Sequence, residues 1–400
     1  MGAAAVERFA AADLGTLGAM QPTMRLYDTA QRAVVPFEAN ERVSIYVCGV
    51  TPYDATHLGH AATYVTYDVL QRRLLDRGHD VRLVRNITDV DDDILRAARE
   101  RRVHYLDLGN GEIKRFHDDL AALGVAEPWS EPRATGAIPD IRGLIAMLLE
   151  RGFAYVTDAG VYFDVAKSTD FGRLSGLDRD EMLRLGVARG ERPDAANKRD
   201  ALDFVLWQPS HPSEPSWESP WGRGRPGWHA ECSALALREL GSTIDIHGGG
   251  CDLVYPHHEC ERAQSEGATG EPFVRHWLHH AMVLCDGEKM SKSRGNLVFV
   301  HDLFEAAEPA AVRLMLLAQH YREAWEWDAS LLDEASARLA RWRTAGAGDG
   351  ALDATRAALD DDLATPSALR AIDAATAAGV GVSAAAELLG VDLRDSSHGT

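Results

Sequence analysis

The chain has 400 residues, of which 46% are hydrophobic and 26% charged, so it can build two or three packed domains. This composition excludes a disordered, collagen-like or coiled-coil protein. No apolar run reaches the roughly 18 uncharged residues of a membrane-spanning helix, so we expect no membrane partner. The net charge of −19 argues against a nucleic-acid partner, because proteins that bind phosphate backbones usually present a basic face.

The cysteine count and the N-terminus indicate the compartment. The first residues are Ala-rich but include Glu7, Arg8 and Asp13, and no basic stretch precedes an apolar core, so we expect no signal peptide. An odd number of cysteines without an export signal argues against a disulfide framework. We therefore expect a cytoplasmic protein whose thiols bind metal or are buried. The five cysteines are Cys48, Cys232, Cys251, Cys260 and Cys285.

The first part of the chain predicts a parallel sheet. Residues 1–24 are expected to form a loosely attached arm. Residues 41–49 (ERVSIYVCG) are β-branched and aromatic, as in a buried strand, and residues 61–76 have the apolar spacing of a helix. Residues 81–86 (VRLVRN) form a second strand, and strand, helix and strand in this order indicate a βαβ unit. Further helices are expected over residues 92–101, 110–123 and 138–151.

Residues 152–226 interrupt this pattern. Two strand-like pieces, FAYVTD and VYFDV, precede a stretch rich in Gly, Pro, Arg and Trp, which indicates an insertion between two halves of the sheet domain. The alternation resumes with a strand at 243–246, which is expected to end in a glycine run. Helices are expected over residues 257–266 and 310–320.

From residue 328 the chain contains no lysine and predicts a small helical domain with helices at 328–345, 352–363 and 366–378. The expected organisation is an arm, two catalytic halves around an insertion, a helical domain and a tail. The boundaries are 1–24, 25–151, 152–226, 227–327, 328–394 and 395–400.

The tetrapeptide HLGH follows the first strand, where ligands bind in parallel α/β sheets. A helix N-terminus offers free N–H groups to phosphate, and Gly59 permits close approach of a nucleotide. His57 and His60 can donate to phosphate oxygens as charge develops. Taken alone, the motif is also compatible with two surface histidines at the start of a helix.

A second motif, KMSKS, contains Lys289 and Lys292, two of only five lysines in the chain. Two ammonium groups in a Ser/Gly loop suit the triphosphate of ATP and the departing pyrophosphate. The alternative is a solvated charged loop.

A third group of residues has the chemistry of a zinc site, although no C-x-x-C spacing is present. Its members are Cys48, Cys232, His257 and Glu261, with His258 and Cys260 as neighbouring alternatives. His257 and Glu261 lie four residues apart and would share a helix face. From the residues alone, unrelated buried cysteines remain the alternative. Asp89 and Asp91–Asp93 could bind Mg²⁺, but a helix cap is the favoured interpretation.

HLGH followed by KMSKS resembles the core of class I aminoacyl-tRNA synthetases. YVCGVTPYD, GWHAECS, DIHGGGCDLVYPHHE and DGEKMSKSRGNLV resemble the cysteine-activating branch, which comprises cysteinyl-tRNA synthetases and the cysteine ligases of mycothiol biosynthesis. MRLYDTAQRAVVPF, CGVTPYDATHLGHAATYVTYD and the short helical C-terminal region are similar to the ligases, and the resemblance spans residues 24–394.

Three features depart from the ligase pattern. Glu261 stands where the tRNA-charging enzymes have a zinc-ligating glutamate, Cys251 replaces a usual serine, and residues 189–194 match only loosely.

The resemblance implies a Rossmann-like parallel-sheet α/β catalytic core with an inserted subdomain and a small helical C-terminal domain. It implies a monomer that uses ATP, with Mg²⁺, to activate L-cysteine and transfers it to the amino group of glucosaminyl-inositol, releasing AMP and diphosphate. It also implies one Zn²⁺ per chain on Cys48, Cys232 and His257, with Glu261 as a fourth ligand or a neighbouring contact.

The same resemblance assigns His57 and His60 to transition-state stabilisation and Lys289 and Lys292 to the leaving pyrophosphate. The residues implied to bind cysteine and its adenylate are Cys48, Gly49, Val50, Thr51, Thr63, Asn86, Ile87, Thr88, Trp228, Gly250, Cys251, Asp252 and Val283. Two other functions remain open: a tRNA-charging enzyme with a shortened anticodon-binding region, and a catalytically silent binding module.

Overall fold

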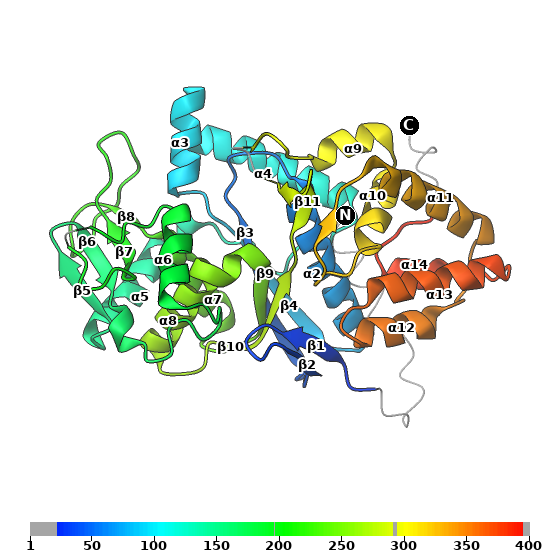
Figure 1. The fold of residues 1–400 in the computed structure, drawn as a ribbon, viewed down its shortest axis with the longest axis horizontal. Coiled ribbons are helices and arrows are strands. Elements are labelled where there is room, and N and C mark those ends of the chain that lie inside the picture. The colour runs from blue at the N-terminus through cyan, green and yellow to red at the C-terminus, as the bar shows by residue number, and fades with distance from the viewer. Residues whose placement is uncertain (1–21, 196, 291–293, 395–400) are drawn as a thin grey trace.

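The computed structural model describes residues 22–195, 197–290 and 294–394, so most of the expected arm, the tail and Lys292 lie outside the described residues. A central parallel sheet separates an inserted subdomain on the left of Figure 1 from the C-terminal helices on the right. No helix among these residues is both long and apolar enough to cross a lipid bilayer.

The central sheet contains β3 (Arg42–Val50), β4 (Asp80–Ile87), β9 (Ile244–Gly250) and β10 (Val274–His280) in the order β10-β9-β3-β4. All three pairings are parallel, which confirms the predicted α/β class. The expectation that this strand ends in the glycine run is confirmed, because β9 continues through Gly248 to Gly250. A Cβ on Gly248 would lie 1.7 Å from the carbonyl oxygen of Leu278, so glycine lets β10 approach.

The two faces of β3 enter different cores, because successive side chains of a strand point to opposite sides. Ile45 and Val47 pack in a core shared with α2 (Leu58–Asp76) and the C-terminal helices. Tyr46 and Cys48 pack on the opposite side with residues of α7 (Trp228–Leu240). The Cys48 side chain therefore points toward α7.

The early helices largely follow the sequence pattern. α3 (Asp92–Arg101) matches its expected bounds, and α5 spans Ile138–Glu150. α4 (Tyr105–Ala122) begins five residues before the expected 110, because His104 Nδ1 accepts from the Leu106 N–H and caps it.

The insertion carries a four-stranded antiparallel sheet in the order β5-β6-β7-β8. The two predicted strands are confirmed as β5 (Ala154–Thr157) and β6 (Gly160–Phe163). The sequence pattern did not reveal β7 (Phe204–Gln208) or α6 (Arg179–Ala188). The insertion also contains η2 (Val165–Lys167) and β8 (Arg225–Pro226), whereas η1 (Ala134–Ala137) precedes α5.

After β9 come η3 (Cys251–Leu253), an irregular wide turn η4 (Val254–His258) and α8 (Glu259–Thr269). A small sheet of order β12-β11-β13 follows β10 and leads to the C-terminal helices. The remaining elements are β1 (Arg25–Asp28), β2 (Ala33–Pro36), β11 (Val283–Cys285), β12 (Glu288–Lys289), α9 (Val300–Ala306), α10 (Pro309–Leu317), β13 (Trp325–Glu326), α11 (Ala329–Ala345), α12 (Leu352–Asp360), α13 (Thr365–Ala377) and α14 (Ser383–Leu388). The predicted C-terminal helices are present, although α12 ends early because Asp362 and Leu363 adopt positive φ.

Candidate active site and metal centre

The carboxyl ends of β3 and β9 meet at the middle of the parallel sheet. The chain leaves β3 toward β4 on one side, whereas β9 leads to β10 on the other side. Such a reversal of strand order opens a crevice at the carboxyl ends of the strands, where ligands bind. Cys48–Val50 and Gly250 stand at this edge.

HLGH lies at the start of α2 and is joined to the segment that follows KMSKS. The Leu58 N–H donates to the Val298 carbonyl at 2.9 Å, and the Val300 N–H donates to the Thr56 carbonyl at 2.9 Å. The structure therefore brings HLGH and the segment that follows KMSKS together, although more than 200 residues separate them.

The HLGH histidines stack on each other with ring centroids 3.8 Å apart. His57 is the N-cap of α2, and its Nδ1 accepts from the Gly59 N–H at 3.1 Å. Burial lowers the pKa of His57 to about 2 and that of His60 to about 4. Both rings are therefore neutral near pH 7, and because His57 Nδ1 accepts from Gly59, its Nε2–H remains as a hydrogen-bond donor.

Lys289 is the KMSKS lysine that the structure describes, and its Nζ donates to Asp252 Oδ2 at 2.8 Å. Burial acts to raise the pKa of Asp252, but the charges of Lys289 and Arg189 outweigh it and hold that pKa far below its usual range. An ionised carboxylate thus holds the lysine at the edge of the crevice.

The expected metal ligands form one cluster. Potential ligand atoms of Cys48, Cys232, His257 and Glu261 all lie within 4.8 Å of one another, and all four residues are buried. They come from β3, α7, η4 and α8. The Cys48 sulfur lies 3.8 and 3.9 Å from the two Glu261 carboxylate oxygens, close to the separation of about 3.5 Å that metal–ligand bonds of about 2.0–2.3 Å produce in a tetrahedral site.

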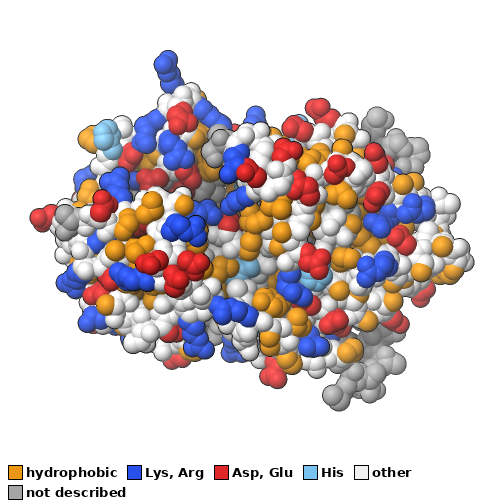
Figure 2. Space-filling view, viewed as in Figure 1, with side chains coloured by type: hydrophobic (Ala, Val, Ile, Leu, Met, Phe, Trp, Pro, Cys, Tyr) orange, Lys and Arg blue, Asp and Glu red, His pale blue; other side chains and the backbone are white. Residues whose placement is uncertain are grey.

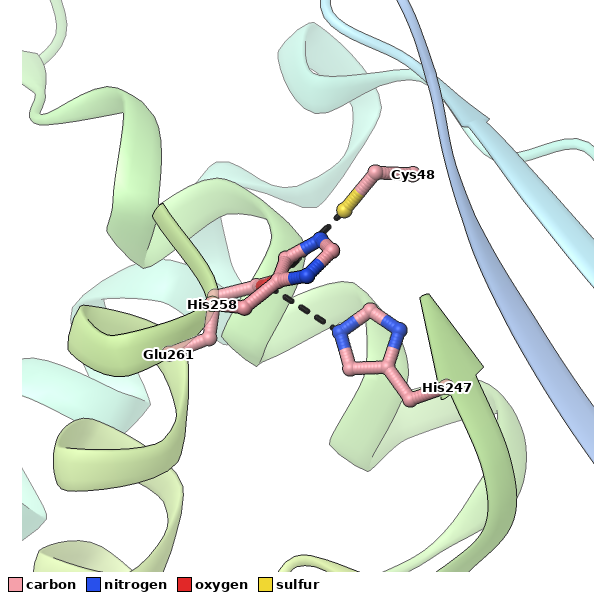
Figure 3. Close-up of side chains that lie close together, drawn as sticks. All are labelled: Cys48, His247, His258 and Glu261. Carbon is pink, nitrogen blue, oxygen red and sulfur yellow. Dashed lines mark hydrogen bonds and ion pairs between the residues drawn. The ribbon is translucent and has the colours of Figure 1, made fainter. Parts of the chain in front are cut away.

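Figure 3 shows a second arrangement that shares Cys48 and Glu261 but uses His247 and His258. His247 Nε2 lies 3.0 Å from Glu261 Oε2, while its Nδ1 contacts the Tyr46 carbonyl at 2.8 Å. The sequence analysis considered His258 but missed His247. Its position in DIHGGG, beside the glycine run at the end of a predicted strand, is the signal that could have found it.

The donor chemistry of both arrangements suits a metal ion. Burial, followed by the nearby Cys232 and Glu261, raises the pKa of the Cys48 thiol, and a cation would offset this cost of forming the thiolate. In the arrangement with His247 and His258, the buried Nε2 of His258 has no hydrogen-bond partner within the described residues.

In the arrangement with Cys232 and His257, His257 Nδ1 lies 2.8 Å from His229 Nδ1, and His257 Nε2 lies 3.7 Å from Glu261 Oε2. Trp228 stacks on the His257 ring with centroids 4.1 Å apart.

Several residues that are expected to contact the adenylate form hydrogen bonds between the ends of β3 and β4. The Gly49 N–H donates to Asn86 Oδ1 at 2.9 Å, and the Thr88 N–H donates to the Val50 carbonyl at 3.0 Å. A Cβ on Gly49 would lie 1.5 Å from the Asn86 carbonyl oxygen, so glycine allows these strand ends to touch.

Other expected contact residues face inward. Ile87 and Val283 are each 1% exposed, and the Thr63 hydroxyl donates to the Gly59 carbonyl within α2.

Thr51 Oγ1 donates to Asp91 Oδ2, while Asp91 Oδ1 accepts from the Ile94 N–H, so the helix-cap interpretation of Asp91 is confirmed. Cys251, one of the five thiols expected to bind metal or to be buried, is instead partly exposed in η3 beside Asp252.

Comparisons with known proteins identify relatives over nearly the whole chain. Residues 34–337 match the family described as "tRNA synthetases class I (C) catalytic domain". The chain is 51% identical over 362 residues to the "L-cysteine:1D-myo-inositol 2-amino-2-deoxy-alpha-D-glucopyranoside ligase" of Thermobispora bispora, covering 89% of this chain and 90% of the relative. It is 49% identical to the ligase of the same name from Mycolicibacterium smegmatis, covering 88% of each.

Solved structures show the same fold at low sequence identity. The Mycobacterium tuberculosis methionyl-tRNA synthetase in complex with methionyl-adenylate is 16% identical with a TM-score of 0.62, covering 84% of this chain and 83% of that one. A putative arginyl-tRNA synthetase from Campylobacter jejuni is 13% identical with a TM-score of 0.56, covering 88% and 90%.

Proposed function

The chain belongs to the class I (C) tRNA synthetase family and, within it, to the L-cysteine:1D-myo-inositol 2-amino-2-deoxy-alpha-D-glucopyranoside ligases, and on this basis we propose that it joins L-cysteine to the amino group of glucosaminyl-inositol at the expense of ATP. The observation that carries this function is the likeness to those ligases over most of both chains. The reaction belongs to mycothiol biosynthesis and releases AMP and diphosphate.

Cysteine selection is assigned to the buried cluster. Cys48, Cys232 and His257 would hold one Zn²⁺, and Glu261 would complete the set or orient it. When bound, the metal supplies an open position that favours a thiolate over a serine hydroxyl. Trp228, stacked on His257, forms a wall of the amino-acid pocket.

In the first step the cysteine carboxylate attacks the α-phosphate of ATP. The neutral His57 and His60 donate hydrogen bonds to the phosphate oxygens as negative charge develops. Lys289 and Lys292, with Mg²⁺, hold the departing pyrophosphate. Gly250 ends β9 and Asp252 lies in η3 directly after it, and both would contact the nucleotide. Most of the rate enhancement then comes from positioning and electrostatics.

In the second step the amine of glucosaminyl-inositol attacks the mixed anhydride and AMP leaves. A small acceptor fits the net charge of −19 better than tRNA does. Figure 2 shows basic and acidic side chains interspersed over this face, with no continuous basic stripe on it. We further propose that the enzyme acts as a cytoplasmic monomer.

The direct test is product formation from ATP and cysteine, with glucosaminyl-inositol and tRNA offered in separate reactions. The expected result is AMP release coupled to cysteinylation of the amino-sugar, with tRNA left uncharged. Charged tRNA with untouched amino-sugar would replace the ligase by a cysteinyl-tRNA synthetase. Absence of both products would favour the silent binding module.

A further inference from the structure

Asp252 holds two cations on one carboxylate oxygen. Lys289 Nζ and one terminal nitrogen of Arg189 each donate to Asp252 Oδ2 at 2.8 Å. The same Arg189 nitrogen lies 3.3 Å from the Asp252 main-chain carbonyl oxygen. Arg189 follows the last residue of α6 in the inserted subdomain, so this contact joins the insertion to the carboxyl end of β9.

This ion cluster belongs to the reacting region. Asp252 raises and Lys289 lowers the pKa values of both HLGH histidines, so the four groups lie within electrostatic reach of one another. The Asp252 side chain is 29% exposed, and the unpaired carboxylate would therefore be partly desolvated.

The Asp252 carboxylate and the phosphates of ATP are both anions and compete for the single charge of the Lys289 ammonium. Moving it to the phosphates removes one of the two cations on the Asp252 oxygen. The guanidinium of Arg189 is already in place, and its second contact with the main chain keeps it there. The carboxylate therefore retains a counterion while the lysine leaves.

We propose that Arg189 is a positioning residue for adenylate formation, which remains the counterion of Asp252 and so frees Lys289 to bind the phosphates of ATP. This inference rests on the proposed function. The inserted subdomain then contributes directly to adenylate formation. It does so through residues 189–194, the segment that matches the ligase pattern only loosely.

The test is cysteine-dependent exchange of labelled pyrophosphate into ATP by the full chain. R189A is expected to slow exchange on the order of tenfold, because Lys289 stays bound to Asp252, and R189K is expected to recover part of the rate. The matched control is R184A, which removes an exposed arginine of α6, the helix that Arg189 follows. Its exchange rate is expected to stay within twofold of wild type. Equal melting temperatures for R189A and wild type would show that folding is intact.

A double-mutant cycle separates this role from a merely structural one. In a D252N background, R189A is expected to have little further effect, because the neutral amide needs no counterion. The inference would be overturned if R189A exchanged pyrophosphate as fast as R184A. It would also be overturned if R189A lowered the exchange rate by the same factor in the D252N background as in wild type. A wild-type chain with no cysteine-dependent exchange would instead overturn the proposed function, and the inference with it.

Discussion

Arg313 of α10 and Asp68 of α2 form an ion pair that is closed off from solvent, with side chains 1% and 0% exposed. The Arg313 guanidinium also donates to the carbonyl oxygens of Leu389 and Leu123 at 2.8 and 3.0 Å. The Arg313 side chain thus connects α10 to α2, the helix that begins with HLGH, and to the ends of α14 and α4. Burial acts to raise the pKa of Asp68, but Arg313 and Arg72 hold it below the usual value.

Replacing Arg313 with alanine is expected to destabilise the protein by about 3–5 kcal/mol, because the Asp68 carboxylate would stay buried without its main partner. Urea unfolding followed by circular dichroism measures this. The control is R356A, since Arg356 pairs with Asp76 but is 38% exposed, and it should cost less than about 1 kcal/mol. Equal losses for both variants would contradict the role of the buried pair.

Acid is expected to unfold the protein because it charges buried histidines. Burial lowers the pKa of His280 to about 4 and that of His279 to about 3. In the unfolded chain both titrate near 6.5, so below this pH the unfolded state binds more protons than the folded state. Stability is therefore fully present above about pH 6.5 and is lost as the pH falls toward 4, by up to about 1.4 kcal/mol per pH unit for each such histidine.

Melting temperatures measured at half-unit steps between pH 7.5 and 4.5 test this expectation on the metal-free protein. The H280Q variant lacks one of these groups, so its melting temperature should fall less steeply with acid than that of wild type. A melting temperature that is flat from pH 6.5 to 4.5 would contradict the argument.

Replacing Cys232 with serine is expected to lower the bound metal well below one ion per chain, because a hydroxyl is a much weaker zinc ligand than a thiolate. Cysteine-dependent pyrophosphate exchange should fall with it, by about 100-fold or more, whereas ATP binding should change little. C285S is the matched control, because Cys285 lies on β11 outside the cluster. Metal content by elemental analysis and exchange rates measure the two effects, and full metal content in C232S would favour the arrangement with His247 and His258.

Replacing His60 with asparagine is expected to slow adenylate formation about 100-fold with little change in the KM for cysteine, because the lost N–H donor acts mainly on the transition state. The exposed His117, which pairs with Glu131 away from this site, provides the control variant H117N. Exchange kinetics at saturating and limiting cysteine distinguish the two parameters. An increase in KM with an unchanged maximal rate would place His60 in ground-state binding instead.

Much of the fold and the site could be predicted from short stretches of sequence. The β-branched runs of β3 and β4 and the apolar spacing of α2 and α11 are local patterns, and they set the class of the sheet and the helical C-terminal region. HLGH and KMSKS are contiguous motifs, so their residues were found without a structure. The helix α6 was missed because its first turn is acidic and its buried positions are few, which leaves a weak periodic signal.

The sequence by itself determined the parallel α/β class, the HLGH and KMSKS motifs and the residue types of a candidate metal centre, because each depends on neighbouring residues or on residue type alone. Only the tertiary structure decided which of these residues meet. β9 pairs with β3 across about 200 residues of chain, and this pairing, together with the packing of α8, places His247 beside Cys48 and Glu261. The same packing sets Arg189 against Asp252. Contacts between distant segments depend on how strands pair and helices pack, and no local spacing encodes them.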